Sequence, residues 1–231
     1  MQRPLALVTG ASTGIGYEMA KVLAAKGYDL VVVARNAKKL KALETELKTS
    51  CRVTSIPLDL SFSKAAKQLF EKTRKAKLTV DLLVNNAGYG SSGEFVSLDI
   101  KGELGQIDLN IRTLTELCHL YGAEMAKRKA GRILNVASTA AFQPGPWMSV
   151  YYATKAYVLH FSEGIAEELK RSGVQVSVLC PGPTVTEFAD TAGMDKSLLF
   201  SSKLMKPATA QYVAKYAVEK LHKGNLIIIP G

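Results

Sequence analysis

Short apolar runs alternate with longer amphipathic stretches along almost the whole chain. Seven of the short runs are rich in β-branched residues and apolar without alternation, at residues 5–9, 30–34, 53–58, 82–85, 133–137, 174–180 and 226–229. Strands that are covered on both faces have this composition, whereas strands with one solvated face alternate. The pattern therefore predicts about seven buried strands.

The stretches between these runs carry apolar residues at helical spacing, which predicts helices at 15–26, 38–48, 63–77, 104–129, 150–171 and 208–223. In four of them a glycine follows a basic last turn, at Gly27, Gly131, Gly173 and Gly224, which is a helix stop signal. Alternating strands and helices predict an α/β fold with a doubly wound parallel sheet and helices on both faces. Ligands of such a sheet lie beyond the carboxyl ends of its strands, where the irregular segments 88–93, 140–148 and 181–206 follow predicted strands.

Length and composition favour one folded unit. With 231 residues, 47% of them hydrophobic and 22% charged, we expect a single domain over residues 1–231. The first apolar run ends at Thr9 and is too short for a signal or membrane segment, so a cytoplasmic location is expected. Cys51, Cys118 and Cys180 stand far apart without a C-x-x-C pair, which predicts reduced thiols and neither a disulfide framework nor a metal site.

The formal net charge of +10 raises the alternative of a nucleic-acid-binding protein. The basic residues are spread over predicted helices, for example within 38–48 and 64–77, where a solvated helix face accounts for them. No dense basic arm or known nucleic-acid-binding module is present, so we do not expect a nucleic-acid partner. The positive field favours anionic ligands such as phosphorylated coenzymes.

A glycine-rich turn follows the first predicted strand and opens a helix, with the sequence Thr9-Gly10-Ala11-Ser12-Thr13-Gly14-Ile15-Gly16. Glycines allow a tight turn and let backbone N–H groups at the helix N-terminus approach a pyrophosphate. The alternative is a turn that binds nothing. Its place in a strand-turn-helix unit favours dinucleotide binding, as in a Rossmann-type fold.

The end of the second predicted strand bears on the choice of coenzyme. Folds that select NAD usually carry a carboxylate there for the ribose 2′-hydroxyl. This chain has Ala34-Arg35 instead, and Asp29 lies at the other end of the strand. Arg35, with Ser12 in the glycine turn, could hold a 2′-phosphate by charge-assisted hydrogen bonds, which predicts NADP(H); the alternative is a solvated arginine.

Tyr151 and Lys155 are four residues apart near the start of a predicted helix, so they share one face. A tyrosine has an ordinary pKa of about 10, and a nearby ammonium favours its phenolate, which makes the pair a candidate general acid/base. The neighbouring Tyr152 has no such partner and is expected to pack.

Six motifs in order give the chain a resemblance to the single-domain short-chain dehydrogenase/reductase family over nearly its whole length. They are T-G-x-x-x-G-x-G at 9–16, N-N-A-G at 85–88, the helix asparagine Asn110, Ser138 after the fifth strand, Y-x-x-x-K at 151–155, and P-G-x-x-x-T at 181–186. The segments 142–154 and 181–188 look most like a group of uncharacterised bacterial reductases that use NADP.

The resemblance implies roles for four side chains. Tyr151 would exchange a proton with the substrate oxygen, Ser138 would hydrogen-bond that oxygen, and Lys155 would bind the ribose hydroxyls and lower the pKa of the tyrosine. Asn110 would hold a water that links Lys155 to solvent. The implied coenzyme contacts are Gly10, Ser12, Thr13, Gly14, Ile15, Gly16, Arg35, Asp59, Leu60, Asn86, Ala87, Gly88, Tyr151, Lys155, Pro181, Gly182, Thr184 and Thr186. Thr184 departs from the Val or Ile more usual beside the nicotinamide.

The expected activity is an NADP(H)-dependent interconversion of a carbonyl and an alcohol. A lipophilic small-molecule substrate is expected because the candidate substrate loop, about 183–206, and the segment 140–148 are apolar; they contain Phe142, Pro144, Pro146, Trp147, Met148, Phe188, Met194, Leu198, Leu199, Phe200, Leu204 and Met205. These residues could instead only pack the loop onto the core. Two alternative functions are a 3-oxoacyl thioester reductase and an NADP-sensing protein without turnover. The helices 104–129 and 150–171 are expected to pair in a homodimer or homotetramer.

Overall fold

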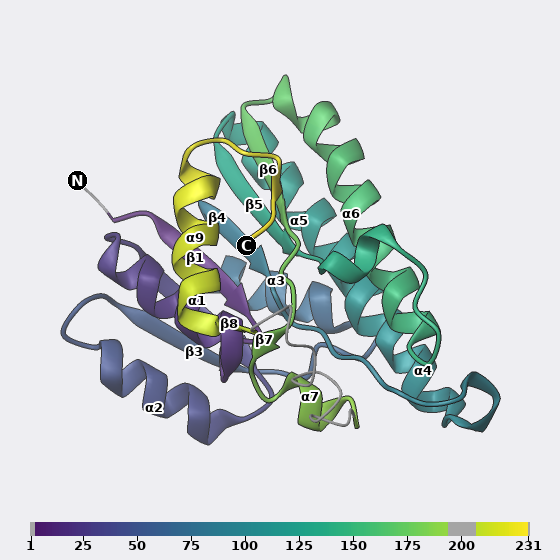
Figure 1. The fold of residues 1–231 in the computed structure, drawn as a ribbon. Helices are drawn as coiled ribbons and strands as arrows, with labels where there is room; N and C mark the ends of the chain where they lie inside the picture. Colours follow the sequence, from purple (N-terminus) through teal and green to yellow (C-terminus); the bar gives the residue numbers. More distant parts are fainter. Residues whose placement is uncertain (1–2, 194–206, 231) are drawn as a thin grey trace.

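The computed structural model describes residues 3–193 and 207–230 of the chain (Figure 1). Within these residues seven parallel strands form one sheet in the order β3-β2-β1-β4-β5-β6-β9. The strands are β1 (Leu5–Thr9), β2 (Asp29–Ala34), β3 (Val53–Pro57), β4 (Leu82–Asn85), β5 (Gly131–Val136), β6 (Val174–Leu179) and β9 (Ile227–Ile228). The structure confirms the predicted doubly wound sheet, and the strand order reverses between β1 and β4.

Helices cover both faces of the sheet (Figure 1). One face carries α1 (Gly14–Ala25), α2 (Ala37–Leu47) and α9 (Ala210–His222), and the other carries α3 (Ala65–Lys75), α5 (Leu114–Arg128) and α6 (Ser149–Lys170). Along β1, Ala6 and Val8 pack into the core beneath α1, α2 and α9, while Leu7 packs into the core beneath α3, α5 and α6. The central strands are therefore apolar without alternation because their residues are buried on one face or the other. The edge strands β3 and β9 differ from the prediction of seven buried strands, since Thr54, Pro57 and Ile227 are exposed there.

The predicted helix at 104–129 differs most from the structure. It starts earlier, as α4 (Ile100–Ile107), where the Asp99 side chain accepts a hydrogen bond from the backbone N–H of Lys101 at 3.2 Å. The π-helical segment Asp108–Thr113 then joins α4 to α5. A π-turn accommodates one additional residue in a helix, which an apolar pattern does not reveal.

Smaller differences concern segment ends. Gly27, Gly173 and Gly224 adopt positive φ angles after their helices, but after α5 the left-handed residue is Lys129, with φ 53°, and Gly131 begins β5. The expected helix at 208–223 begins at Ala210, because Ala208–Thr209 forms strand β8 beside β7 (Thr184–Val185). Three short helices lie in or beside the irregular segments: η1 (Phe95–Ser97) follows the first, η3 (Thr139–Phe142) begins at the start of the second, and α7 (Phe188–Thr191) lies within the third. Elements of two to four residues are too short to leave a periodic pattern.

Buried polar groups away from the sheet's carboxyl edge have structural partners. The Asp29 carboxylate accepts hydrogen bonds from the backbone and side chain of Arg52 at 3.0 and 2.8 Å. Burial alone would raise the pKa of Asp29, but these bonds outweigh it and hold the pKa below its usual value. The Asp29 side chain thus lies at the amino end of β2, as expected.

The three cysteines, Cys51, Cys118 and Cys180, are buried free thiols, also as expected. Across the described ranges, no helix is both long enough and apolar enough to cross a membrane.

Candidate active site

The glycine-rich turn between β1 and α1 is fixed by the segment after β4. Thr9 Oγ1 accepts hydrogen bonds from the backbone N–H groups of Asn86 and Ala87, both at 3.0 Å. The Asn86 side chain donates to the carbonyls of Thr9 and Gly10 at 3.0 and 3.2 Å. A Cβ at Gly16 would come within 2.4 Å of this carboxamide, so only glycine fits there. The N-N-A-G motif therefore shapes the turn, and the Asn86 side chain is committed to backbone contacts.

The first turn of α1 has the features of an anion site. Thr13 precedes the helix in an extended conformation, its side chain makes no capping hydrogen bond, and no acidic residue lies in the first turn. Helix N-terminal amides with no competing carboxylate suit a pyrophosphate. A Cβ on Gly14 would lie 3.1 Å from the Thr186 side chain, so the fold brings the first and last expected motifs together.

Tyr151, Lys155 and Ser138 meet beside the carboxyl end of β5. Lys155 Nζ lies 5.7 Å from the centre of the Tyr151 ring and donates a hydrogen bond to the Val136 carbonyl at 2.9 Å. The Ser138 hydroxyl accepts from the Ala140 N–H at 3.1 Å and lies close enough to the Tyr151 phenol to affect its ionisation.

Burial dominates the ionisation of this pair. It raises the pKa of Tyr151 to about 12, against the opposing effect of the Ser138 hydrogen bond. It also lowers the pKa of Lys155 to about 8, because an ammonium loses hydration when buried. This differs from the expectation that Lys155 brings the tyrosine pKa below its ordinary value: burial raises this pKa, and the Ser138 hydrogen bond is the interaction that opposes it.

Asn110 lies in the π-helical segment and ties three elements together. Its carboxamide accepts from the Tyr89 N–H at 3.2 Å and donates to the Tyr89 carbonyl at 2.9 Å and to Thr154 Oγ1 at 3.1 Å. Thr154 Oγ1 in turn donates to the Tyr151 carbonyl at 2.8 Å. The side chain of Asn110 thus positions the loop after β4 against the first turn of α6, which leaves little of its hydrogen-bonding capacity for a water.

Two glycines after β4 allow close approach to the candidate catalytic side chains. A Cβ at Gly88 would lie 2.9 Å from Asn110 Oδ1 and 3.5 Å from Lys155 Nζ. A Cβ at Gly90 would come within 2.9 Å of the Tyr151 ring and 3.1 Å of Phe188. Gly90 was not among the residues expected at the site; its position in an irregular loop between two further glycines was the signal available in the sequence.

The 2′-phosphate candidate Arg35 lies directly after β2, with its side chain exposed. Burial would raise the pKa of Asp59, but two hydrogen bonds from Ser61, together with the nearby positive charge of Arg35, outweigh it and hold this pKa below its usual value. Asp59 accepts from Ser61 N and Oγ at 2.9 and 2.7 Å. Leu60 is buried in the core, so only its backbone borders this edge.

The segments around Tyr151 form one rim. The Ser92 N–H donates to the Ala192 carbonyl at 2.9 Å, and the Gly93 N–H donates to the Trp147 carbonyl at 2.8 Å. Trp147 has φ 67°, a left-handed conformation that bulky residues rarely adopt, and its side chain is 63% exposed. Phe142 is 52% exposed, whereas Met148 is buried. The expected substrate residues Met194, Leu198, Leu199, Phe200, Leu204 and Met205 lie outside the described residues.

The P-G-x-x-x-T segment joins this rim to the sheet. The Pro181 carbonyl accepts from the Thr139 N–H at 2.9 Å and from Ser138 Oγ at 3.4 Å. Thr184 Oγ1 donates to the Gly182 carbonyl at 2.9 Å, so the hydroxyl that replaces the usual Val or Ile methyl is satisfied within its own turn. The departure at Thr184 therefore leaves this turn without an unpaired hydroxyl.

Residues 4–197 match the family described as short chain dehydrogenase. The chain belongs to this family. An uncharacterised oxidoreductase of Staphylococcus epidermidis is 30% identical over 194 residues, 82% of each protein, which agrees with the bacterial group that the sequence resembles. A very-long-chain 3-oxoacyl-CoA reductase of Podospora anserina is 36% identical over 94% of this chain and 62% of its own length. A short-chain dehydrogenase of Sphingobium yanoikuyae in complex with NADPH superposes with a TM-score of 0.90 at 34% identity, covering 98% of this chain and 87% of its own.

Membership in this family means that the chain has the short-chain dehydrogenase fold and is an oxidoreductase. Solved structures of the same fold hold NADPH in one case and NAD in another, so the family shows a nicotinamide coenzyme and does not decide between the two. The carboxyl edge of the sheet, where the glycine turn, Asn110, Ser138, Tyr151 and Lys155 converge, is the candidate site of that chemistry.

Proposed function

We propose that this short-chain dehydrogenase interconverts a carbonyl and an alcohol on a lipophilic small molecule with NADP(H), and that residues 1–231 act as one catalytic domain with a substrate loop at about 183–206. One observation carries the proposal: the Tyr151 phenol, the Ser138 hydroxyl and Lys155 Nζ gather beside Gly88 and Gly90, next to a helix N-terminus suited to a pyrophosphate. Free buried thiols are compatible with a reducing cytoplasm, where we place the protein.

The nicotinamide of the bound coenzyme would supply the hydride. Tyr151 then has to provide the proton to the carbonyl oxygen, and a pKa of about 12 keeps the phenol protonated at neutral pH. Ser138 would donate a hydrogen bond to the same oxygen, and Lys155 would bind the ribose hydroxyls. The protonated phenol is the form that carbonyl reduction requires, and we take reduction as the cellular direction.

The preference for NADP(H) rests on Arg35. It stands at the end of β2 where an NAD-selecting protein usually has a carboxylate, and among the described residues it forms neither a hydrogen bond nor an ion pair. The guanidinium is therefore available for a 2′-phosphate. NADPH in the Sphingobium relative supports the same choice.

The proposal of a lipophilic substrate is based on the exposed aromatic side chains at the rim. Phe142 and Trp147 are 52% and 63% exposed beside the segment that contacts Tyr151, and the Trp147 backbone is held in a strained conformation. Strain of this kind persists where neighbouring contacts impose it and often marks a ligand-binding position. The very-long-chain acyl substrate named for the Podospora relative is consistent with an apolar site.

A homologous series of linear ketones and aldehydes, assayed spectrophotometrically with saturating NADPH, tests activity and substrate class together. We expect kcat/KM to climb several-fold per added methylene before levelling off, since each buried methylene contributes about 0.8 kcal/mol. Trp147→Ala should flatten this slope while leaving NADPH binding unchanged. Better turnover of polyhydroxylated carbonyls would reject the lipophilic site, and the absence of turnover with every carbonyl would favour an NADP sensor.

The relative from Podospora specifically favours a second candidate, a 3-oxoacyl thioester reductase. It would use the same four side chains. Lys196, Lys203 and Lys206, which could attract an anionic carrier, lie outside the described residues. A higher kcat/KM for acetoacetyl thioesters than for simple ketones of equal length would select this alternative.

The pKa of Lys155 predicts how coenzyme affinity depends on pH. A lysine is charged below its pKa and neutral above it, so with a pKa of about 8 the ammonium is lost as the pH rises from 7 to 9. Fluorescence titration should show NADPH binding weakening by about tenfold across this range, the contribution of one charged hydrogen bond. In Lys155→Met the affinity should be low and independent of pH between 7 and 9; an unchanged pH dependence in that variant would assign the effect to another group.

We also propose that the protein is a homodimer or homotetramer. Ile100, Leu104 and Ile107 lie at positions i, i+4 and i+7 of α4 with 57%, 53% and 38% exposure, and Tyr157 of α6 is 36% exposed. Apolar residues at this spacing form a stripe that a symmetric contact would bury. Light scattering at micromolar concentration should give a dimer or tetramer that Leu104→Lys converts to monomer, whereas Lys101→Ala on the same helix should not. A monomeric parent protein would refute the assembly.

A further inference from the structure

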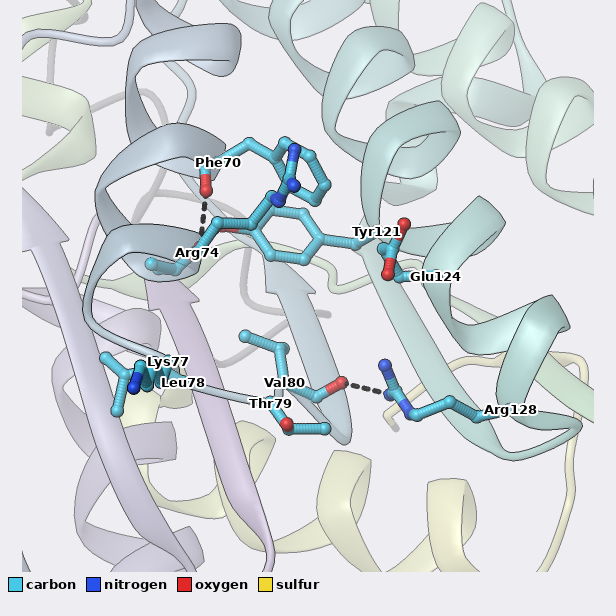
Figure 2. A pocket seen from close by; sticks show the side chains of 10 residues that line it. Phe70, Arg74, Lys77, Leu78, Thr79, Val80, Tyr121, Glu124 and Arg128 are labelled. Carbon is cyan, nitrogen blue, oxygen red and sulfur yellow. Dashed lines mark hydrogen bonds between the residues drawn. The ribbon is translucent and has the colours of Figure 1, made fainter.

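A cavity of about 260 Å³ lies between α3, α5 and the connection from α3 to β4 (Figure 2). Val80, on its wall, precedes the amino end of β4, whereas the candidate active site gathers at the carboxyl ends of the strands. The cavity is therefore at the opposite edge of the sheet and belongs to no part of the site described above. Its volume is just below the range of about 300–1,000 Å³ typical of drug-sized ligand sites, so it suits a molecule of one or two rings.

Two aromatic rings, Val80 and Thr73 line the floor of the cavity, and the two hydroxyls there are hydrogen-bonded to each other. The Phe70 and Tyr121 rings meet edge to face, with centroids 5.1 Å apart. The Tyr121 phenol and Thr73 Oγ1 are hydrogen-bonded at 2.9 Å. Thr73, Tyr121 and Val80 are buried. A flat apolar body could lie on this floor without leaving a buried polar group unpaired.

The rim of the cavity is basic. Arg74 lies over the Phe70 ring at 5.8 Å, and within the described part of the chain its guanidinium forms no hydrogen bond or ion pair. Arg128 donates from Nη2 to the Val80 carbonyl at 2.8 Å, and among residues 3–193 and 207–230 its other N–H groups have no hydrogen-bond partner, so they can bind a ligand. Figure 2 shows the two guanidiniums on different sides of the space, Arg74 beside Phe70 and Arg128 beside Val80.

A third cation is placed at the rim by the way α3 ends. The N–H of Lys77 bonds to the Arg74 carbonyl at 2.9 Å and that of Leu78 to the Thr73 carbonyl at 3.0 Å, the pattern of a Schellman motif. Glycine usually occupies the left-handed position of this motif, but here Lys77 does, with φ 53°. The chain thus accepts a backbone conformation that is unfavourable for lysine and gains a charge beside the cavity.

One acidic residue, Glu124, faces the same space. A hydrogen bond from Lys127 at 2.9 Å, aided by the charges of Arg74 and Arg128, holds its pKa below the usual value, so it is ionised at neutral pH. Three basic side chains against one acidic side chain leave the rim positive. A phosphate monoester, with a charge of about −1.5 to −2, is repelled by Glu124 more than a carboxylate is.

We propose that this cavity is a binding site for a small aromatic carboxylate, whose ring lies on Phe70, Tyr121 and Val80 and whose carboxylate lies between Arg74 and Arg128. The planar guanidinium fork matches a carboxylate with two parallel hydrogen bonds. The binding site is separate from the coenzyme and substrate, and it does not depend on the reaction proposed above.

Isothermal titration of the full chain, saturated with NADPH, with 2-naphthoate tests the site. We expect binding that Arg74→Gln weakens by about tenfold or more, as the loss of a hydrogen bond between charged groups requires. Glu124→Gln should tighten it by removing the repulsive charge. Lys72→Gln is the matched control, since it removes a positive charge two residues away on α3, where the side chain points to another face of the helix.

The neutral 2-naphthamide separates a carboxylate site from a merely apolar one. It should bind at least about tenfold more weakly than 2-naphthoate, because it offers no charge to the two arginines. Equal binding of the two compounds, or equal effects of Arg74→Gln and Lys72→Gln, would overturn the proposal. Loss of 2-naphthoate binding in Trp147→Ala with retention in Arg74→Gln would place the compound in the substrate site and overturn it as well.

Discussion

Tyr151→Phe should lower kcat for carbonyl reduction by about 10²- to 10⁴-fold, the usual contribution of general acid catalysis. The substitution removes the transferable proton and keeps the ring that packs against Gly90 and Phe188. The fold and the affinity for NADPH should therefore be preserved. Steady-state kinetics together with a fluorescence titration of NADPH measure both quantities.

Tyr152→Phe is the matched control for this variant. Tyr152 lies next in the chain, but its ring packs against Gly145, where an added Cβ would come within 2.3 Å of it. Loss of the Tyr152 hydroxyl should leave kcat within about twofold of the parent value, since the effects of substitutions at residues without a special role are usually small. A Tyr151→Phe enzyme that keeps more than about a tenth of kcat would show that another group donates the proton.

Arg35→Asp should reverse or abolish a preference for NADPH over NADH that we expect to be about ten- to hundredfold in the parent enzyme. The guanidinium follows β2 directly and is the group placed to bind a 2′-phosphate, while an aspartate there would repel the phosphate and accept a hydrogen bond from a ribose hydroxyl. The measurement is kcat/KM for both coenzymes with one carbonyl substrate.

Lys48→Asp controls for the change in net charge. Lys48 caps the other end of α2, so the variant alters the charge of the protein equally without touching the end of β2. Its ratio of kcat/KM for the two coenzymes should match that of the parent. If the unmodified enzyme used NADH and NADPH equally, Arg35 would not select the coenzyme.

The sequence by itself determined the sheet and the position of the chemistry. Short apolar runs without alternation favour strands covered on both faces, and the structure has strands at all seven of them, as β1 to β6 and β9, although the edge strands β3 and β9 are partly exposed. The glycine turn after β1 and the four-residue spacing of Tyr151 and Lys155 are local features, so they were visible before any contact was known. Their side chains meet because parallel strands end at the same edge of the sheet.

Only the tertiary structure decided which partner each polar group binds. Asn86 is committed to the backbone of the glycine turn, and Asn110 to Tyr89 and Thr154, through contacts between residues far apart in sequence. The raised pKa of Tyr151 also follows from its burial in three dimensions, which the four-residue spacing of Tyr151 and Lys155 does not reveal. The cavity beside Arg74 and Arg128 has no sequence pattern, because its walls come from two helices and a loop whose basic residues look like ordinary solvated helix ends until packing brings them to one rim.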